Sequence, residues 1–146
     1  MMRGFTLIEM MIVVAILAII GFVAVGFVSD SVPRNQLQAE TDALVGMARR
    51  AQSRTIAGQE GDVWGVRVET TRAILFLGDD FAARDAAFDE VRLFPNGVRA
   101  TGTGEVAFRI RTGTPLASAT FILANVDASR SRTVAVNVQG QIYEME

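Results

Sequence analysis

The chain has 146 residues, half of them apolar, and its formal net charge is -2. This length accommodates one domain and an accessory segment, and the small net charge gives no electrostatic reason to expect nucleic acid or an anionic membrane surface as a partner. Cysteine and histidine are absent, and all 14 basic residues are arginine. Without these residues the chain can form no disulfide and no Schiff base, and it lacks the usual metal ligands and the Walker-type lysine. We therefore expect no enzyme, no cofactor and no metal site.

An unbroken apolar run occupies Met10 to Val28, near the start of the chain. As a helix it would span roughly 28 Å, close to the thickness of the hydrocarbon core of a bilayer. The run is too long for the apolar part of a secretory signal, and no small-residue cleavage site follows it. Arg3 before the run and Asp30 after it predict a single membrane span, with the N-terminus in the cytoplasm and the bulk of the chain outside.

Glu9 directly precedes this predicted span, where burying a carboxylate in the membrane costs free energy. At the bilayer centre the cost is roughly 2.5–3.5 kcal/mol, so a carboxylate in a span indicates a function and a partner. An amine is the natural partner. A cut between Gly4 and Phe5 would place the new ammonium of Phe5 one helical turn from Glu9, in the same chain or in a neighbour. Such a pair would set the register of a helix bundle, because a wrong register leaves a charge unpaired.

The stretch from Arg3 to Glu9, RGFTLIE, followed at once by the apolar run, resembles the N-terminal signal of type IV pilins and type II secretion pseudopilins. The resemblance implies that residues 1–4 are a leader. A prepilin peptidase would cut after Gly4 and methylate the new amine of Phe5, and Glu9 would guide assembly. It also implies a place in the inner membrane through residues 5–28, contact with an assembly platform there, and later contact with other subunits in a filament.

Residues 29–57 predict an amphipathic continuation of this helix, with Gly58 as its stop. Pro33 suggests a kink or a short non-helical stretch near the join. Residues at a 3-4 spacing form one narrow stripe that we expect to be buried: Leu37, Thr41, Leu44, Ala48, Ala51 and Thr55. Charged residues are expected on the other faces: Glu40, Asp42, Arg49, Arg50 and Arg54.

Residues 58–146 predict a β-rich head made of short strands. The segments are rich in β-branched and aromatic residues: DVWGVRV, AILFL, EVRLF, EVAFRIR, ATFIL, RTVAVNV and QIYEM. Two alternating sets are each predicted to share a face: Val106, Phe108 and Ile110, and Val134, Val136 and Val138. Turn pairs such as Asn96-Gly97 and Gln139-Gly140 separate the strands, and the last two segments predict a terminal hairpin. An antiparallel sheet packed on the stripe of the long helix gives an α+β fold.

The pilin resemblance implies the same architecture, a pilin-like roll in which an antiparallel sheet clasps the outer half of a long N-terminal helix. The tail, with FPNGV, EVAFRIRTGTP, FIL and RTVAVNVQGQI, is similar to GspH/FimT-like minor pilins and pseudopilins, and so is the helix end MARRAQSRTIAG. The lack of cysteine, and of a proline inside the apolar run, departs from the usual major pilin. These departures favour a minor subunit over a classical major pilin, while a major subunit of a divergent lineage stays open, as do pilus, type II secretion and competence systems.

Two further stretches are candidate binding sites, but each also has an explanation that needs no ligand. The acidic stretch from Asp79 to Glu90 suggests calcium, but it lacks EF-hand spacing and a solvated loop is preferred. Arg130 and Arg132 could contact phosphate, which the resemblance implies for FimT-like pilins that take up DNA, but the chain ends in the acidic YEME. Trp64 is expected to pack against the helix. Two other functions therefore remain, a DNA-binding minor pilin for natural transformation and an uncleaved, membrane-anchored extracellular binding module.

Overall fold

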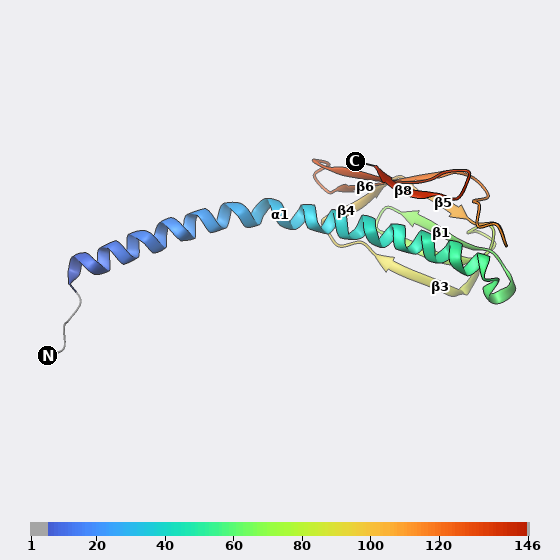
Figure 1. Ribbon diagram of the computed structural model, residues 1–146, viewed down its shortest axis with the longest axis horizontal. Coiled ribbons are helices and arrows are strands. Elements are labelled where there is room, and N and C mark those ends of the chain that lie inside the picture. The colour runs from blue at the N-terminus through green and yellow to red at the C-terminus, as the bar shows by residue number, and fades with distance from the viewer. Residues whose placement is uncertain (1–5, 146) are drawn as a thin grey trace. The chain divides into compact units, whose positions relative to one another are not determined.

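The computed structural model describes residues 6–145, and residues 23–34 by their helical backbone alone. One long helix, α1 (Leu7–Ile56), is followed by the short 3-10 helix η1 (Gln59–Gly61) and by the strands (Figure 1). The strands are β1 (Trp64–Glu69), β2 (Arg72–Leu77), β3 (Asp85–Leu93), β4 (Val98–Thr101), β5 (Gly104–Ala107), β6 (Ala119–Asn125), β7 (Ser131–Val136) and β8 (Ile142–Met145). The predicted leader and cleavage site, from Met1 to Phe5, lie outside the described residues.

The chain divides into two compact units, Met1–Arg34 and Asn35–Glu146, and the second is called the head below. The amphipathic part of the helix, from Asn35 onward, thus belongs with the head. α1 is helical without a break, so the short non-helical stretch that Pro33 suggested is not present. A proline removes one backbone hydrogen bond from a helix, and neighbouring turns can continue on both sides of it.

The head contains two four-stranded antiparallel sheets rather than the single sheet predicted. Their strand orders are β3-β2-β1-β5 and β4-β6-β7-β8. Strand β4 was not predicted from the sequence, because its four residues carry too little pattern, yet it pairs with β6 over its whole length. The terminal hairpin of β7 and β8 is confirmed, with Val136 opposite Ile142. The predicted α+β class, a long helix packed on antiparallel strands, is also confirmed.

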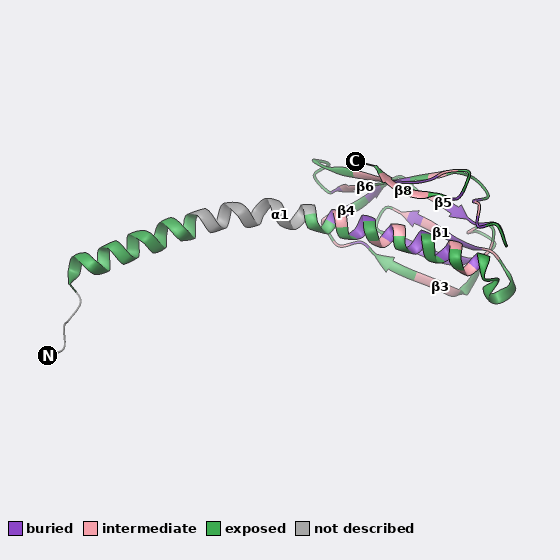
Figure 2. Ribbon diagram, viewed as in Figure 1, coloured by how far each residue is buried: buried purple, intermediate pink, exposed green. Residues whose placement is uncertain are grey.

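The predicted buried stripe of α1 is confirmed at every position. Its six residues are at most 2 % exposed: Leu37, Thr41, Leu44, Ala48, Ala51 and Thr55. Its four apolar members, Leu37, Leu44, Ala48 and Ala51, join one core with residues of both sheets, among them Val66, Leu123 and Val134. Figure 2 shows this side of α1 buried while the opposite side is exposed. The stripe therefore fixes the helix to both sheets at once.

Glu40 lies outside the predicted stripe, as expected, yet it is buried, so the buried part of the helix is wider than the one narrow stripe predicted. It is only 8 % exposed, because Arg92 on β3 donates from Nε and an Nη to its two carboxylate oxygens at 2.8 and 3.0 Å. The hydrogen bonds to Glu40 raise the pKa of Arg92 above its usual range. Within the last two turns of the helix, Arg54 and Arg50 both bind Glu90 on β3. The side of α1 that faces β3 is therefore lined with ion pairs.

The end of α1 is tied to the first strand through a hydroxyl. Gly58 adopts a left-handed φ of 65°, which ends the helix as predicted. The Oγ1 of Thr55 donates to the carbonyl of Ala51 at 2.9 Å and accepts the backbone N–H of Trp64 at 2.8 Å. Trp64 is 4 % exposed, with the guanidinium of Arg54 4.6 Å above its ring, so its predicted packing against the helix is confirmed.

Two predicted strands end early, which moves residues out of the core. Strand β5 stops at Ala107, and Ile110 in the following turn is 42 % exposed. Strand β7 stops at Val136, and Val138 in the turn before β8 is 65 % exposed. In both places the chain folds back within a few residues: Gly113 donates to Arg109, and Gly140 donates to Asn137. In the sequence, the alternation of apolar residues continues beyond the last residue of each strand. It therefore predicted strands that are too long.

Both of these turns are fastened to α1 by one side chain, Gln52. Its Nε2 donates to the carbonyl of Gly113 at 2.7 Å and to the carbonyl of Gly140 at 2.8 Å. Gly140 has a φ of 82°, and an added Cβ there would lie 2.6 Å from the carbonyl oxygen of Gly113. The close approach of the two turns therefore requires glycine at position 140.

Replacing Gln52 by alanine is expected to lower the free energy of unfolding of the head by about 1–3 kcal/mol, because two partly buried carbonyls lose their donor. Gln38→Ala is the matched control, since the amide of Gln38 reaches only the exposed Asp42, and its effect should stay within about 0.5 kcal/mol. Urea unfolding of the full chain in detergent, followed through the single, buried tryptophan, measures both. Equal effects of the two substitutions would contradict this role of Gln52.

Candidate functional site

The first helical turn of α1 begins with a threonine cap. Thr6 precedes the helix, its Oγ1 accepts the backbone N–H of Glu9 at 3.3 Å, and its carbonyl accepts the N–H of Met10. Thr6 and Glu9 are the first and fourth residues of a Thr-x-x-Glu capping box, a pattern that marks helix starts. A carboxylate in the first turn also lies where the helix dipole favours negative charge. The Thr-x-x-Glu pattern thus gives Glu9 a local role that the predicted pairing with an amine did not include.

Glu9 itself is exposed in the described chain. The predicted partner, the amine of Phe5, lies outside the described residues. The structure shows where the carboxylate of Glu9 lies. It stands in the first turn of the helix, immediately before the apolar run.

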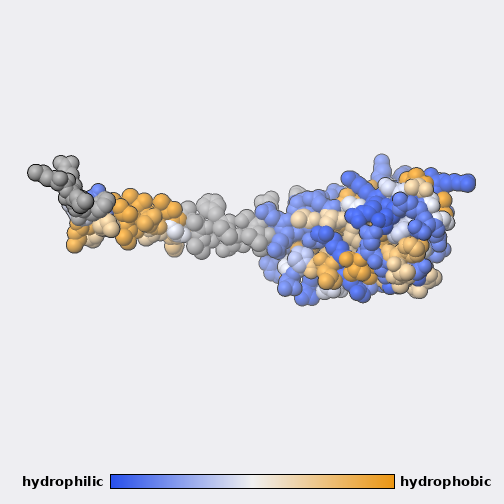
Figure 3. All heavy atoms as spheres, turned by 90° about the horizontal axis from the view of Figure 1, so that it is seen from below, coloured by the Kyte–Doolittle hydropathy of each residue, from blue (hydrophilic) through white to orange (hydrophobic). Residues whose placement is uncertain are grey.

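The helix that follows is apolar on every side. From Leu7 to Phe22 its large apolar side chains are between 46 % and 86 % exposed: Leu7, Ile8, Met10, Met11, Ile12, Val13, Val14, Ile16, Leu17, Ile19, Ile20 and Phe22. Figure 3 shows the same segment as a hydrophobic surface. A helix that is apolar all round is normally buried, in a bilayer or among other helices. The segment therefore requires an apolar surrounding, which the described part of the chain does not supply.

The predicted membrane span was tested on part of its length only. Among the helical residues whose side chains are described, there is no stretch long and apolar enough to cross a membrane. The predicted span runs on to Val28, and residues 23–28 lie outside that part of the chain.

The two arginines proposed for nucleic acid both have carboxylates nearby. Arg132 forms an ion pair with Glu144 on the neighbouring strand β8. Arg130 is exposed, next to the turn that contains Asp127. Hydrogen bonds from the backbone and the hydroxyl of Ser129, with a smaller contribution from Arg130, lower the pKa of Asp127 below its usual range. Asp127 therefore stays charged at neutral pH, and the phosphate-binding hypothesis gains no support from this arrangement.

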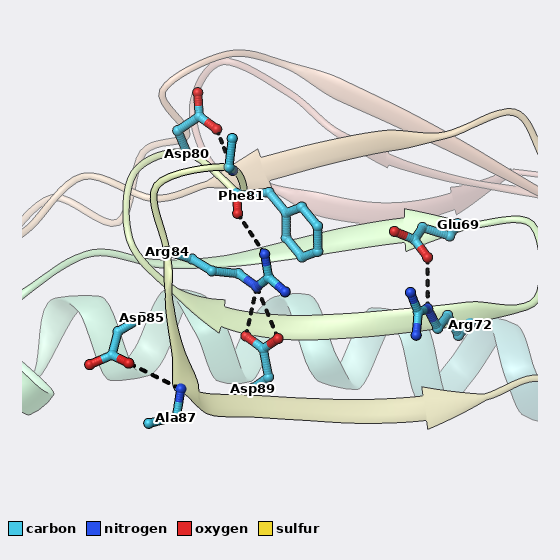
Figure 4. A network of polar contacts seen from close by, with 9 residues as sticks. Glu69, Arg72, Asp80, Phe81, Arg84, Asp85, Ala87 and Asp89 are labelled. Carbon is cyan, nitrogen blue, oxygen red and sulfur yellow. Dashed lines mark hydrogen bonds and ion pairs between the residues drawn. The ribbon is translucent and has the colours of Figure 1, made fainter.

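The acidic stretch proposed for calcium is held by contacts within the protein (Figure 4). The Nε of Arg84 donates to both carboxylate oxygens of Asp89, at 2.9 and 3.0 Å, and its guanidinium lies 3.8 Å from the ring centre of Phe81. Asp80 accepts the backbone N–H of Ala82, and Asp85 accepts that of Ala87 at the start of β3. Within residues 6–145, no three His, Cys, Asp or Glu side chains gather closely enough to hold a metal ion. Phe81 in this stretch packs edge-on against Phe76 of β2, with ring centroids 5.4 Å apart.

Comparison with known proteins gives two matches. Residues 1–25 match the family model of the prokaryotic N-terminal methylation motif. The fold is similar to that of the minor pseudopilin EpsH from the type 2 secretion system of Vibrio cholerae, with a TM-score of 0.57 and 11 % sequence identity over 75 % of this chain and 96 % of EpsH. No curated protein matches the chain.

The motif and the fold define a class: a chain with an N-terminal methylation motif, an apolar helix and a β-rich head. Together the two findings support the type IV pilin and pseudopilin family, as the sequence predicted. That family is structural rather than enzymatic, in agreement with the expectation that the chain is not an enzyme.

Proposed function

We propose that the chain is a minor pilin or pseudopilin, a structural subunit of a type IV pilus or of a type II secretion filament. The observation that carries the proposal is the apolar helix from Leu7 to Phe22, exposed on all sides and starting directly behind the Thr6–Glu9 cap. Such a surface is stable only when it is covered. A membrane before assembly and a bundle of identical helices after it would both cover it.

The proposal includes processing at the N-terminus. A prepilin peptidase cuts between Gly4 and Phe5 and methylates the amine of Phe5. The new N-terminus then lies one residue before the Thr6 cap. In the filament, Glu9 of one subunit binds the amine of Phe5 on a neighbour and so sets the register of the helices.

The place of the chain in the cell follows from the same segment. Before assembly the helix spans the inner membrane with its N-terminus in the cytoplasm, and the head lies outside. The partners are the prepilin peptidase, an assembly platform in that membrane, and other pilin-like subunits. The exposed apolar helix and the motif match over residues 1–25 support this arrangement.

Substitution of Gly4 by valine tests the processing step. We expect the variant to stay uncut and to be absent from the sheared filament fraction of its host, because a branched side chain at the cut site blocks a peptidase that needs glycine there. Thr6→Ser is the control, since serine keeps both the cap and the cut site. Gel mobility of the two variants and of the parent measures processing. Filament entry of an uncut Gly4→Val chain would contradict the proposal.

A further inference from the structure

The β4-β6-β7-β8 sheet packs one face on the core and leaves its other face uncovered. Because side chains alternate along a strand, the neighbours of core residues such as Leu123 and Val134 point away from the core. They are every second residue of the ranges 99–101, 120–124, 131–135 and 143–145, and we call this set the open face. Its large apolar side chains are between 38 % and 43 % exposed: Ile122, Tyr143 and Met145.

The open face carries almost no charge. Within the described strands Arg99, at one corner, is its one charged residue, and the other nine are apolar or carry hydroxyl groups. The outward face of the other sheet differs, since it carries ion pairs such as Arg67–Glu105 and Glu69–Arg72. Charged residues are depleted at the centres of protein interfaces, where tyrosine and methionine are enriched. The open face therefore has the composition of a docking surface rather than of a face kept in water.

We propose that, before assembly, the open faces of two copies of this chain pack against each other about a two-fold axis parallel to the strands. The inference rests on the proposed function, because two copies anchored in one membrane must point the same way. An axis parallel to the strands keeps the direction of the strands, and of α1 along them. Since α1 lies on the core side of each sheet, the contact is made by the sheets and not by the head segments of the helices.

This axis brings large side chains opposite small ones. It passes between the two central strands, so that β6 faces β7 of the partner and β4 faces β8. Ile122 and Thr133 are cross-strand neighbours in one row, which also contains Thr101 and Met145. Ile122 of one copy then lies opposite Thr133 of the other, and Met145 lies opposite Thr101. Facing layers that alternate large and small side chains can interdigitate.

Arg99 remains at the rim of the proposed interface. It lies in the row beyond Thr101, and the facing strand β8 ends at Met145, one row earlier. A charge at a rim stays in water, whereas a charge at the centre loses its hydration and needs a partner. The two-fold arrangement therefore buries no unpaired charge and brings no like charges face to face.

The small size of the open face makes anchoring important. The face measures roughly 19 Å across its four strands and roughly 14 Å along them, on the order of 300 Å² in projection. Stable dimers bury about 800 Å² per partner, so this contact is weak between copies that diffuse freely in solution. Anchoring in one membrane raises the effective concentration of the two copies and favours the dimer.

Cross-linking through introduced cysteines tests the pairing, since the chain has none of its own. Thr101→Cys and Met145→Cys are combined in one full-length chain, and membranes of its host are treated with a short bis-maleimide. Within one chain these positions are three strand spacings apart, roughly 14 Å, whereas facing sheets are only about 10 Å apart with their side chains pointing toward each other. We expect covalent dimers and no larger species, because a two-fold contact is closed.

Each single-cysteine variant is a matched control. In the proposed dimer its two cysteines lie roughly 14 Å or more apart, so it should give at least about fivefold fewer covalent dimers than the double variant. Single variants that cross-link as well as the double variant, species of three or more copies, or cross-links only to a different protein would each overturn the inference.

A charge at the centre of the open face tests the same contact. Ile122→Arg in the double-cysteine chain should reduce the covalent dimers by at least about tenfold, because two guanidinium groups enter the interface without counter-charges. Ile110→Arg is the matched control, since Ile110 is 42 % exposed against 38 % for Ile122 but lies in the turn after β5, outside the open face. Its dimers should form as in the parent. Equal results for the two arginine variants would contradict docking through the open face.

An intact-mass measurement on the same sample separates this inference from the proposed function. A chain that is cut after Gly4 and methylated, yet gives no more dimers than its single-cysteine variants, refutes the docking and leaves the pilin assignment standing. A chain that is uncut refutes the pilin assignment itself.

Discussion

Replacing Glu9 by glutamine is expected to reduce entry of the chain into filaments by at least about tenfold, while leaving its head folded. In the proposed assembly the substitution leaves the amine of a neighbouring Phe5 buried without a counter-charge, which costs about 3–5 kcal/mol. The local consequence is smaller. Loss of a carboxylate from the first helical turn changes helix stability by about 0.3–1 kcal/mol, and the Thr6 Oγ1 still accepts the N–H of residue 9.

The size of the effect therefore decides between the two roles of Glu9. The measurement is the ratio of chain in sheared filaments to chain in membranes, for parent and variant, in a host that lacks its own copy. Glu9→Asp serves as control, because it keeps the charge and should retain part of the assembly. A glutamine variant that enters filaments within about fivefold of the parent would leave only the helix-capping role for Glu9.

Substitution of Gly65 by alanine is expected to destabilise the head by about 1–3 kcal/mol. Gly65 lies in β1, between β2 and β5. A Cβ there would lie 2.5 Å from Cζ of Phe76 and 2.8 Å from the carbonyl oxygen of Val106. The ring of Phe76 cannot move aside easily, because it is fully buried and the ring of Phe81 packs edge-on against it with centroids 5.4 Å apart. The added methyl group therefore cannot be accommodated by a small movement of its neighbours.

Gly104 offers a matched control for this prediction on the neighbouring strand β5. A Cβ at Gly104 would meet only the ring of Phe121, at 3.4 Å, which is ordinary contact. Gly104→Ala should therefore change the free energy of unfolding by no more than about 0.5 kcal/mol. Urea unfolding followed through Trp64 fluorescence compares the two variants. If both variants lose the same stability, the close contacts around position 65 are not the cause of the loss.

Much of the helix could be predicted from the sequence, because its pattern is regular. The 3-4 spacing of the buried stripe identified all six of its residues, and Gly58 marked the helix end. Glu40 could not be placed in the same way. Its burial depends on Arg92, which is 52 residues further along the chain and arrives only when β3 lies beside α1.

The arrangement of the strands was harder to predict from the sequence. Periodicity locates apolar segments but does not say how strands divide between sheets, and the division here depends on long-range pairings such as β1 with β5. Alternation also overran the strand ends at Ile110 and Val138, where tight turns fixed by Gln52 remove the residues from the core. The Thr6–Glu9 cap, in contrast, could have been found from its Thr-x-x-Glu pattern.

The intact mass of the chain, purified from membranes and filaments of its own host, tests the central claim most directly. The account predicts a chain that lacks Met1 to Gly4 and carries one added methyl group on Phe5. A chain that still begins at Met1, with no methyl group, would contradict it and would leave an anchored β-rich head in place of a filament subunit.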